Sequence, residues 1–249
     1  MFLTKDDLKL AYGVDLEIGA VYVDRPVPSE NLYWKGRTIY TPGAPGYIFM
    51  PIFADILFRC GAEKKLILSN DFISINEKIL HSAALLEHQQ ISWQEHAKQL
   101  NENLSLYVKD SSLFEALSKY LGQPTPHKIS GSSLGTNFPS LNRADTYLYS
   151  LACIDSPMFD QARAISGWYA IMTYFLILDD LADIKDDLIK GEDNVLIDVG
   201  MNASGIEKVN AMIDNSMAVM LSINPVMANR IDHKKTVIDL EEIIRSITA

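Results

Sequence analysis

The chain has 249 residues, of which 48% are hydrophobic and 22% are charged, so it is long enough and apolar enough to bury the core of one large domain. This composition excludes global disorder and a fibrous or low-complexity chain. Acidic residues outnumber basic residues by 32 to 22, and a formal net charge of −10 repels phosphate backbones, so we expect no nucleic-acid partner.

Residues 1–50 differ in composition from the rest of the chain. The Pro-Gly pairs at residues 42–43 and 45–46 separate short pieces that are rich in β-branched and aromatic residues, such as Val21-Tyr22-Val23. This pattern is typical of turns and of a small hairpin. We therefore predict an irregular or β-containing segment over residues 1–50, followed by a helical domain over residues 51–249.

Helix signals dominate the predicted helical domain. Ser92 and Glu95 form a capping box, in which a serine at the start of a helix pairs with a glutamate three residues later. Residues 123–139 are polar and rich in proline and glycine, which predicts a loop. Ser156-Pro157 predicts the start of the next helix, and Gly191 predicts its end. The expected fold class is mainly α.

Three features of the sequence indicate the compartment. Two cysteines, Cys60 and Cys153, are too few for a disulfide framework. The first residues, MFLTKDDLKL, lack the pattern of a signal peptide. The longest stretch without a charge or a helix-breaking residue covers residues 168–178, well short of the roughly 18–20 residues that a membrane span needs. We expect a cytoplasmic protein without a transmembrane segment.

Most of the net charge lies in one stretch of the chain. Between Asp179 and Asp214 there are ten acidic and three basic residues, a local charge of −7 out of −10. At about 100° per residue, five carboxylates of the helix predicted over residues 167–191 fall within an arc of about 120°. These five are Asp179, Asp180, Asp183, Asp186 and Asp187.

The same face of this helix is apolar and aromatic before residue 178. Extending the helical wheel backward places four large apolar side chains on it, namely Trp168, Met172, Phe175 and Leu176. The pattern favours a helix that lines a cavity, apolar along its length and rich in carboxylates at its mouth. The alternative, which the pattern leaves open, is a core helix that emerges into solvent at Leu178.

The five aspartates also indicate a metal ion. Like-charge pairs at i,i+4 on a helix cost about 0.2–0.5 kcal/mol each, and a hard divalent cation removes this repulsion. Mg²⁺ is usually held by a few carboxylate oxygens together with water and substrate phosphates. We therefore predict that Mg²⁺ binds to the acidic face.

Asp179-Asp180-Leu-Ala-Asp183 is a D-D-x-x-D motif, and it follows the sequence W-Y-A-x-x-x-Y-F-L-x-L of residues 168–178. Together they resemble the metal-binding helix of class I isoprenoid synthases, particularly terpene synthases. The resemblance implies a helical bundle of the class I terpene-synthase type that acts on a prenyl diphosphate, as a lyase or transferase. It also implies that Asp179 and Asp183 are metal ligands and that Asp180 is a ligand or supports one.

The resemblance further implies a dry pocket, which would shield a carbocation from water. Its wall would be formed by Trp168, Met172, Phe175 and Leu176. A diphosphate also needs cationic partners, and the candidates are Lys190 and Arg230. The oligomeric state stays open, and a homodimer is compatible with the sequence.

Two other functions are alternatives. The first is a non-enzymatic helical protein whose acidic helix face binds a basic partner or a divalent ion. The second is a serine hydrolase, because Gly131-Ser-Ser133-Leu-Gly135 matches G-x-S-x-G. A nucleophile elbow needs a strand directly before the serine and a helix directly after it, and the flanking prolines favour a flexible loop instead.

Overall fold

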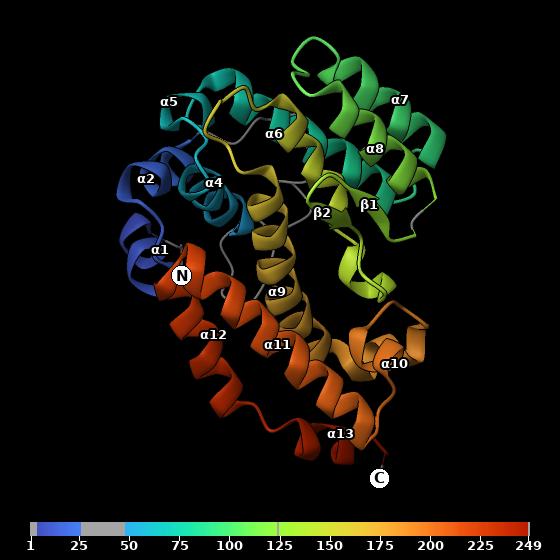
Figure 1. Ribbon diagram of the computed structural model, residues 1–249. Coiled ribbons are helices and arrows are strands. Elements are labelled where there is room, and N and C mark those ends of the chain that lie inside the picture. Colours follow the sequence, from blue (N-terminus) through green and yellow to red (C-terminus); the bar gives the residue numbers. More distant parts are fainter. Residues whose placement is uncertain (1–3, 26–47, 124, 249) are drawn as a thin grey trace.

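The computed structural model describes residues 4–25, 48–123 and 125–248 and is mainly helical, as predicted (Figure 1). In chain order the elements are α1 (Lys5–Tyr12), α2 (Leu16–Asp24), α4 (Phe49–Arg59), α5 (Lys64–Ile67), α6 (Asn70–Glu87), α7 (Trp93–Leu104), α8 (Ser111–Gly122), β1 (His127–Ile129), β2 (Ser132–Leu134), the 3-10 helices η1 (Pro139–Asn142) and η2 (Asp145–Cys153), α9 (Gln161–Lys190), α10 (Val195–Val199), α11 (Ala203–Ile223), α12 (Pro225–Val237) and α13 (Leu240–Thr248).

The long helix α9 runs through the middle of the described fold (Figure 1). It packs against α4, α10 and α11. Gly167 permits a close approach, because a Cβ atom there would lie 2.8 Å from Cγ2 of Ile56 in α4 and 3.1 Å from Cδ1 of Ile223 in α11. The first half of α9 is therefore enclosed by neighbouring helices.

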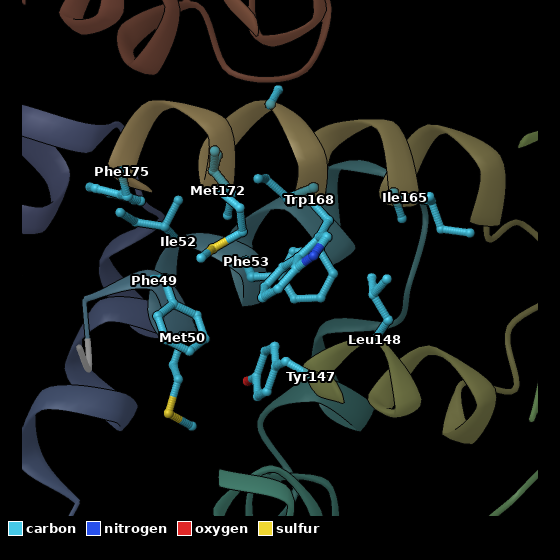
Figure 2. Packing of buried hydrophobic residues seen from close by; sticks show 14 of the residues in the cluster. Phe49, Met50, Ile52, Phe53, Tyr147, Leu148, Ile165, Trp168, Met172 and Phe175 are labelled. Atoms are coloured by element: carbon cyan, nitrogen blue, oxygen red, sulfur yellow. The ribbon is translucent and has the colours of Figure 1, made fainter. Parts of the chain in front are cut away.

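An aromatic cluster forms the core between α9, α4 and η2 (Figure 2). The Trp168 side chain is fully buried. Its ring centroid lies 4.8 Å from that of Phe53, 5.5 Å from that of Tyr147 and 5.8 Å from that of Phe49. These edge-on and stacked contacts hold α9 against α4 and η2.

The prediction of an irregular or β-containing N-terminal segment is wrong for residues 4–25, which form α1 and α2. Thr4 caps α1 with a capping box, and the Asp15 side chain caps α2. Val21-Tyr22-Val23, which we assigned to a segment of turns and a small hairpin, lies in α2, where the buried Tyr22 hydroxyl donates to the carbonyl oxygen of Ile67. Residues 26–47, with their Pro-Gly pairs, lie outside the described residues.

The small β-sheet lies instead within the predicted loop at residues 123–139. Strands β1 and β2 pair antiparallel, with His127 opposite Leu134. The next helix also begins later than predicted, because Asp160 rather than Ser156 caps α9. Ser156 donates its hydroxyl to the carbonyl oxygen of Gly61, so its side chain is not available as a cap. The predicted end of α9 at Gly191 is confirmed, with φ of 69°.

The sequence predicts no transmembrane segment. None of the helices within residues 4–25, 48–123 and 125–248 combines the length and the hydropathy of a membrane span.

Candidate functional site

The acidic face of α9 is divided into two parts in the structure. Asp180 and Asp187 are buried, with exposed fractions of 1% and 7%. Asp179 is half-buried, whereas Asp183 and Asp186 are exposed. The five carboxylates that the helical wheel places on one arc therefore have different surroundings, and only some of them can reach a ligand from solvent.

Asp180 is held inside the fold by two donors. Nη2 of Arg143 lies 2.6 Å from Oδ1 of Asp180, and the backbone N–H of Val195 donates to Oδ2 at 2.6 Å. Burial raises the pKa of Asp180, although the N–H of Val195 and the charge of Arg143 act in the opposite direction. With both carboxylate oxygens engaged, Asp180 connects α9 to α10 and to the segment after η1.

Asn194 completes this connection. Its Nδ2 donates to the backbone carbonyl of Asp180 and to Oδ2 of Asp187, each at 2.8 Å. Its Oδ1 accepts from the N–H of Leu196 at 2.9 Å and so caps α10. Asp187 thus also supports the α9–α10 contact. The sequence reasoning missed both Arg143 and Asn194, which share no periodicity with the aspartates.

The remaining charged residues of this face form what we call the α9 ledge, namely Asp179, Asp183, Asp186 and Lys190. Taking Asp179 as zero at about 100° per residue, Asp183 falls near 40°, Asp186 near −20° and Lys190 near 20°. Asp183, Asp186 and Lys190 are exposed. The ledge brings one of the two predicted diphosphate-binding cations, Lys190, to the same side of α9 as Asp179 and Asp183.

The described residues hold no group of three or more His, Cys, Asp and Glu side chains arranged to bind a metal ion. Asp179 and Asp183 would therefore have to bind a metal as a pair. This fits Mg²⁺ in one of its common settings, in which one or two carboxylates act with water and substrate phosphates. It does not fit an ion enclosed by protein ligands alone.

The predicted pocket wall lies in the packed core. Trp168, Met172, Phe175 and Leu176 have exposed fractions of 0% to 7%. Figure 2 shows Trp168, Met172 and Phe175 between α9, α4 and η2, with side chains of α4 and η2 beside them. In this structure, these side chains contact other core residues.

A buried carboxylate that the sequence reasoning missed lies next to Trp168. Asp145 of η2 accepts hydrogen bonds from Trp168 Nε1 at 3.0 Å, from the Tyr120 hydroxyl at 2.6 Å and from the Tyr169 hydroxyl at 2.9 Å. Burial raises the pKa of Asp145 to about 6, although the three donors act in the opposite direction. The Tyr169 hydroxyl also accepts from the N–H of Gly135, which ties the hairpin to α9.

The second predicted cation, Arg230, lies away from the ledge. The guanidinium carbon of Arg230 lies 4.2 Å from the ring centroid of Tyr12. Arg230 is also close to Tyr174, because its charge acts against the burial that raises the pKa of Tyr174. Tyr174 and Asp183 are nine residues apart, which puts them about 180° apart around α9. Arg230 and Asp183 are therefore not brought together by α9.

Ser133, the candidate nucleophile of the hydrolase alternative, is exposed on β2 and pairs with Lys128 across the hairpin. The structure places a short hairpin around G-x-S-x-G, not a strand followed by a helix. This backbone lacks the strained turn of a nucleophile elbow.

Comparison of the chain with protein-family models, with curated proteins and with solved structures found no match.

Proposed function

We propose that the protein is a Mg²⁺-dependent, terpene-synthase-like protein that binds the diphosphate of a prenyl diphosphate on the α9 ledge. The observation that carries the proposal is the position of Asp179 and Asp183, one helical turn apart on one side of α9. Asp183 is exposed there, while Asp180 and Asp187 are buried in the contact with α10. Asp179 and Asp183 are thus the two motif aspartates that lie on the ledge.

The roles of the ledge residues follow from their charge. Asp179 and Asp183 would supply carboxylate oxygens to Mg²⁺, whereas Asp180 would hold α9 in place through Arg143 and Val195. Lys190 would add a donor for the phosphate oxygens at the far end of the ledge. When bound, the ion would neutralise the negative charge that develops on a departing diphosphate.

The prenyl chain sets a further requirement. The apolar part of the same helix face begins at Leu176 and Phe175, about one turn before Asp179, and continues back to Trp168. These side chains pack against α4 and η2, so carbocation chemistry on a prenyl chain would require α9 and α4 to separate there (Figure 2). We expect diphosphate binding itself to be independent of this opening.

The experiment compares thermal stability with Mg²⁺, with pyrophosphate and with both. We expect Mg²⁺ and pyrophosphate together to raise the melting temperature of the wild type, because a ligand that binds only the folded state stabilises it. Asp183→Asn should abolish that increase. Asp155→Asn is the matched control, since Asp155 is exposed and lies outside α9. An equal increase in the wild type and Asp183→Asn, or none in the wild type, would contradict the proposal.

The second candidate is a non-enzymatic protein that uses the α9 ledge to bind a basic partner or a divalent ion. The close packing of Trp168 against α4 and η2 favours it, because this function needs no apolar pocket. It predicts salt-sensitive binding of a basic peptide such as oligolysine, which is weakened by Asp183→Asn and requires neither Mg²⁺ nor pyrophosphate. Turnover of geranyl or farnesyl diphosphate by the wild type would exclude it.

A further inference from the structure

We propose that Arg230 and Tyr174 form a binding site for a single oxyanion group, a phosphate or a carboxylate, which is separate from the α9 ledge and needs no metal ion. We call it the Arg230 site, and it consists of Arg230, Tyr174 and Tyr12. The proposal does not rest on the function proposed for the ledge.

Three helices build the Arg230 site. Arg230 comes from α12, Tyr12 from α1 and Tyr174 from α9. The guanidinium carbon of Arg230 lies 4.2 Å from the ring centroid of Tyr12. Phe175 adjoins both tyrosines, with ring centroids 6.2 Å from Tyr12 and 5.2 Å from Tyr174. The guanidinium therefore packs against the Tyr12 ring, and Phe175 supports the two tyrosines.

Two polar atoms of this site lack a well-formed hydrogen bond in the described part of the chain. Nε of Arg230 and the hydroxyl of Tyr174 are both buried and have no hydrogen-bond partner there. Within residues 4–25, 48–123 and 125–248, no carboxylate forms an ion pair with Arg230, whereas Arg25, Arg59 and Arg143 each form one. Arg230 lies close enough to the Tyr174 and Tyr12 hydroxyls to act against the burial that raises both pKa values, but Nε of Arg230 and the Tyr174 hydroxyl make no hydrogen bond of normal distance and angle. Two donors are thus positioned next to each other, and an anion bound there would accept from both.

Leaving these donors unpaired is costly. A buried hydrogen-bonding group without a partner loses its hydration without compensation, and the free-energy cost is larger for a charged group. A cation–π contact with Tyr12 offsets only part of this cost. An anion that accepts from Nε and from the Tyr174 hydroxyl would remove the penalty.

The chemistry of the donors defines the ligand class. A guanidinium presents donors in a planar fork that matches carboxylate and phosphate oxygens. Burial raises the pKa of Tyr174 to about 12, so its hydroxyl is protonated at neutral pH and can donate. Arg230 as a whole is half-buried, which leaves part of its side chain accessible from solvent.

The Arg230 site and the ledge lie on different sides of α9. Tyr174 precedes Asp183 by nine residues, which corresponds to about 180° around the helix and about 13 Å along it. A ligand at Arg230 would therefore not contact Asp183. The two sites can be tested independently.

The test measures binding of inorganic phosphate and of acetate by calorimetry, with EDTA present and with ionic strength held constant by chloride. We expect saturable binding of at least one anion to the wild type, and the tighter of the two identifies the ligand class. Arg230→Gln should weaken this binding at least tenfold. Tyr174→Phe, which removes one neutral donor, should weaken it about threefold to tenfold.

Two further variants complete the experiment. Lys234→Gln removes the same charge from the same helix and should bind like the wild type, as should Asp183→Asn. If Arg230→Gln does not fold, Arg230→Lys replaces it, because a lysine keeps the charge but loses the planar fork, and it should bind more weakly. Absence of saturable binding to the wild type, or binding that Arg230→Gln and Arg230→Lys leave unchanged, would overturn the proposal.

Discussion

Arg143 and Asp180 form an ion pair, with Nη2 of the arginine 2.6 Å from Oδ1 of the aspartate. Asp180 is 1% exposed, and the arginine that neutralises it comes from the segment between η1 and η2. This pair withdraws the second aspartate of D-D-x-x-D from the surface. The outer face of α9 is thereby limited to Asp179 and the residues that follow it along the ledge.

The ion pair predicts the effect of replacing Arg143. Arg143→Gln would leave the buried Asp180 carboxylate without its cation, and we expect the free energy of unfolding to fall by about 1–3 kcal/mol. Urea denaturation followed by circular dichroism measures this change. Lys185→Gln removes a charge from an exposed position of α9 and serves as the control. Equal stability of the two variants would show that Asp180 does not depend on Arg143.

Asp145 predicts a loss of stability as the pH rises. Its pKa is about 6 in the folded protein against 3.8 for a free carboxyl group, so the folded state binds this proton more tightly than the unfolded state. The resulting stabilisation is complete below about pH 4 and is lost as the pH rises through 6. In Asp145→Asn this dependence disappears. Relative to the wild type, the variant should therefore gain up to about 3 kcal/mol between pH 4 and pH 7.

Tyr120→Phe tests the same relationship from the donor side. Removing the hydroxyl that donates to Asp145 at 2.6 Å takes away one group that lowers the carboxyl pKa. The pH-dependent loss of stability should then shift to a higher pH. Urea denaturation between pH 4 and pH 8 measures both variants. A wild-type curve identical in shape to that of Asp145→Asn would rule out this role for the carboxyl group.

The buried His96 predicts a loss of stability as the pH falls, which is opposite to the dependence expected from Asp145. It is fully buried between α6 and α7, with Nδ1 2.8 Å from the Ser82 hydroxyl oxygen and with Nε2 lacking a partner in the described chain. Burial lowers its pKa below 6.5, so the unfolded state takes up a proton first as the pH falls. Stability is then lost as the pH falls below about 6.5. His96→Gln should remove this loss.

The control for His96 is His88→Gln, which removes an imidazole from an exposed position at the end of α6. Thermal denaturation at pH 5, 6 and 7 compares the two variants with the wild type. If His96→Gln loses as much stability on acidification as the wild type, the acid sensitivity arises elsewhere.

Local signals in the sequence predicted the parts of the fold that depend on neighbouring residues. Ser92 accepts from the N–H of Glu95, as its capping box indicates, and Gly191 ends α9 in the left-handed conformation. Val21-Tyr22-Val23 was misinterpreted because its β-branched residues favour strands. The segment forms a helix instead. Asp15 caps this helix, and Tyr22 makes a buried hydrogen bond to Ile67, which lies 45 residues away.

The candidate site was likewise predictable only where it depends on residues close together in the sequence. Helical spacing predicted that Asp179 and Asp183 share one side of α9, because this depends only on residues within the helix. The burial of Asp180 depends on Arg143, which precedes it by 37 residues, and no periodicity connects the two. Asp145 was missed for the same reason, since its three donors come from α8 and α9.

Gly135 joins the hairpin to this buried carboxylate and gives a last prediction. Its φ is 78°, and a Cβ atom there would lie 2.6 Å from Cε2 of Tyr120, the ring whose hydroxyl donates to Asp145. Gly135→Ala should therefore combine backbone strain with displacement of Tyr120 and cost more than about 2 kcal/mol in the free energy of unfolding. Gly191→Ala is the matched control, because Gly191 has φ of 69° and no atom within 4 Å of the added Cβ. It should lose only about 1–2 kcal/mol of strain energy, and an equal loss in both variants by urea denaturation would show that Tyr120 does not need the space at Gly135.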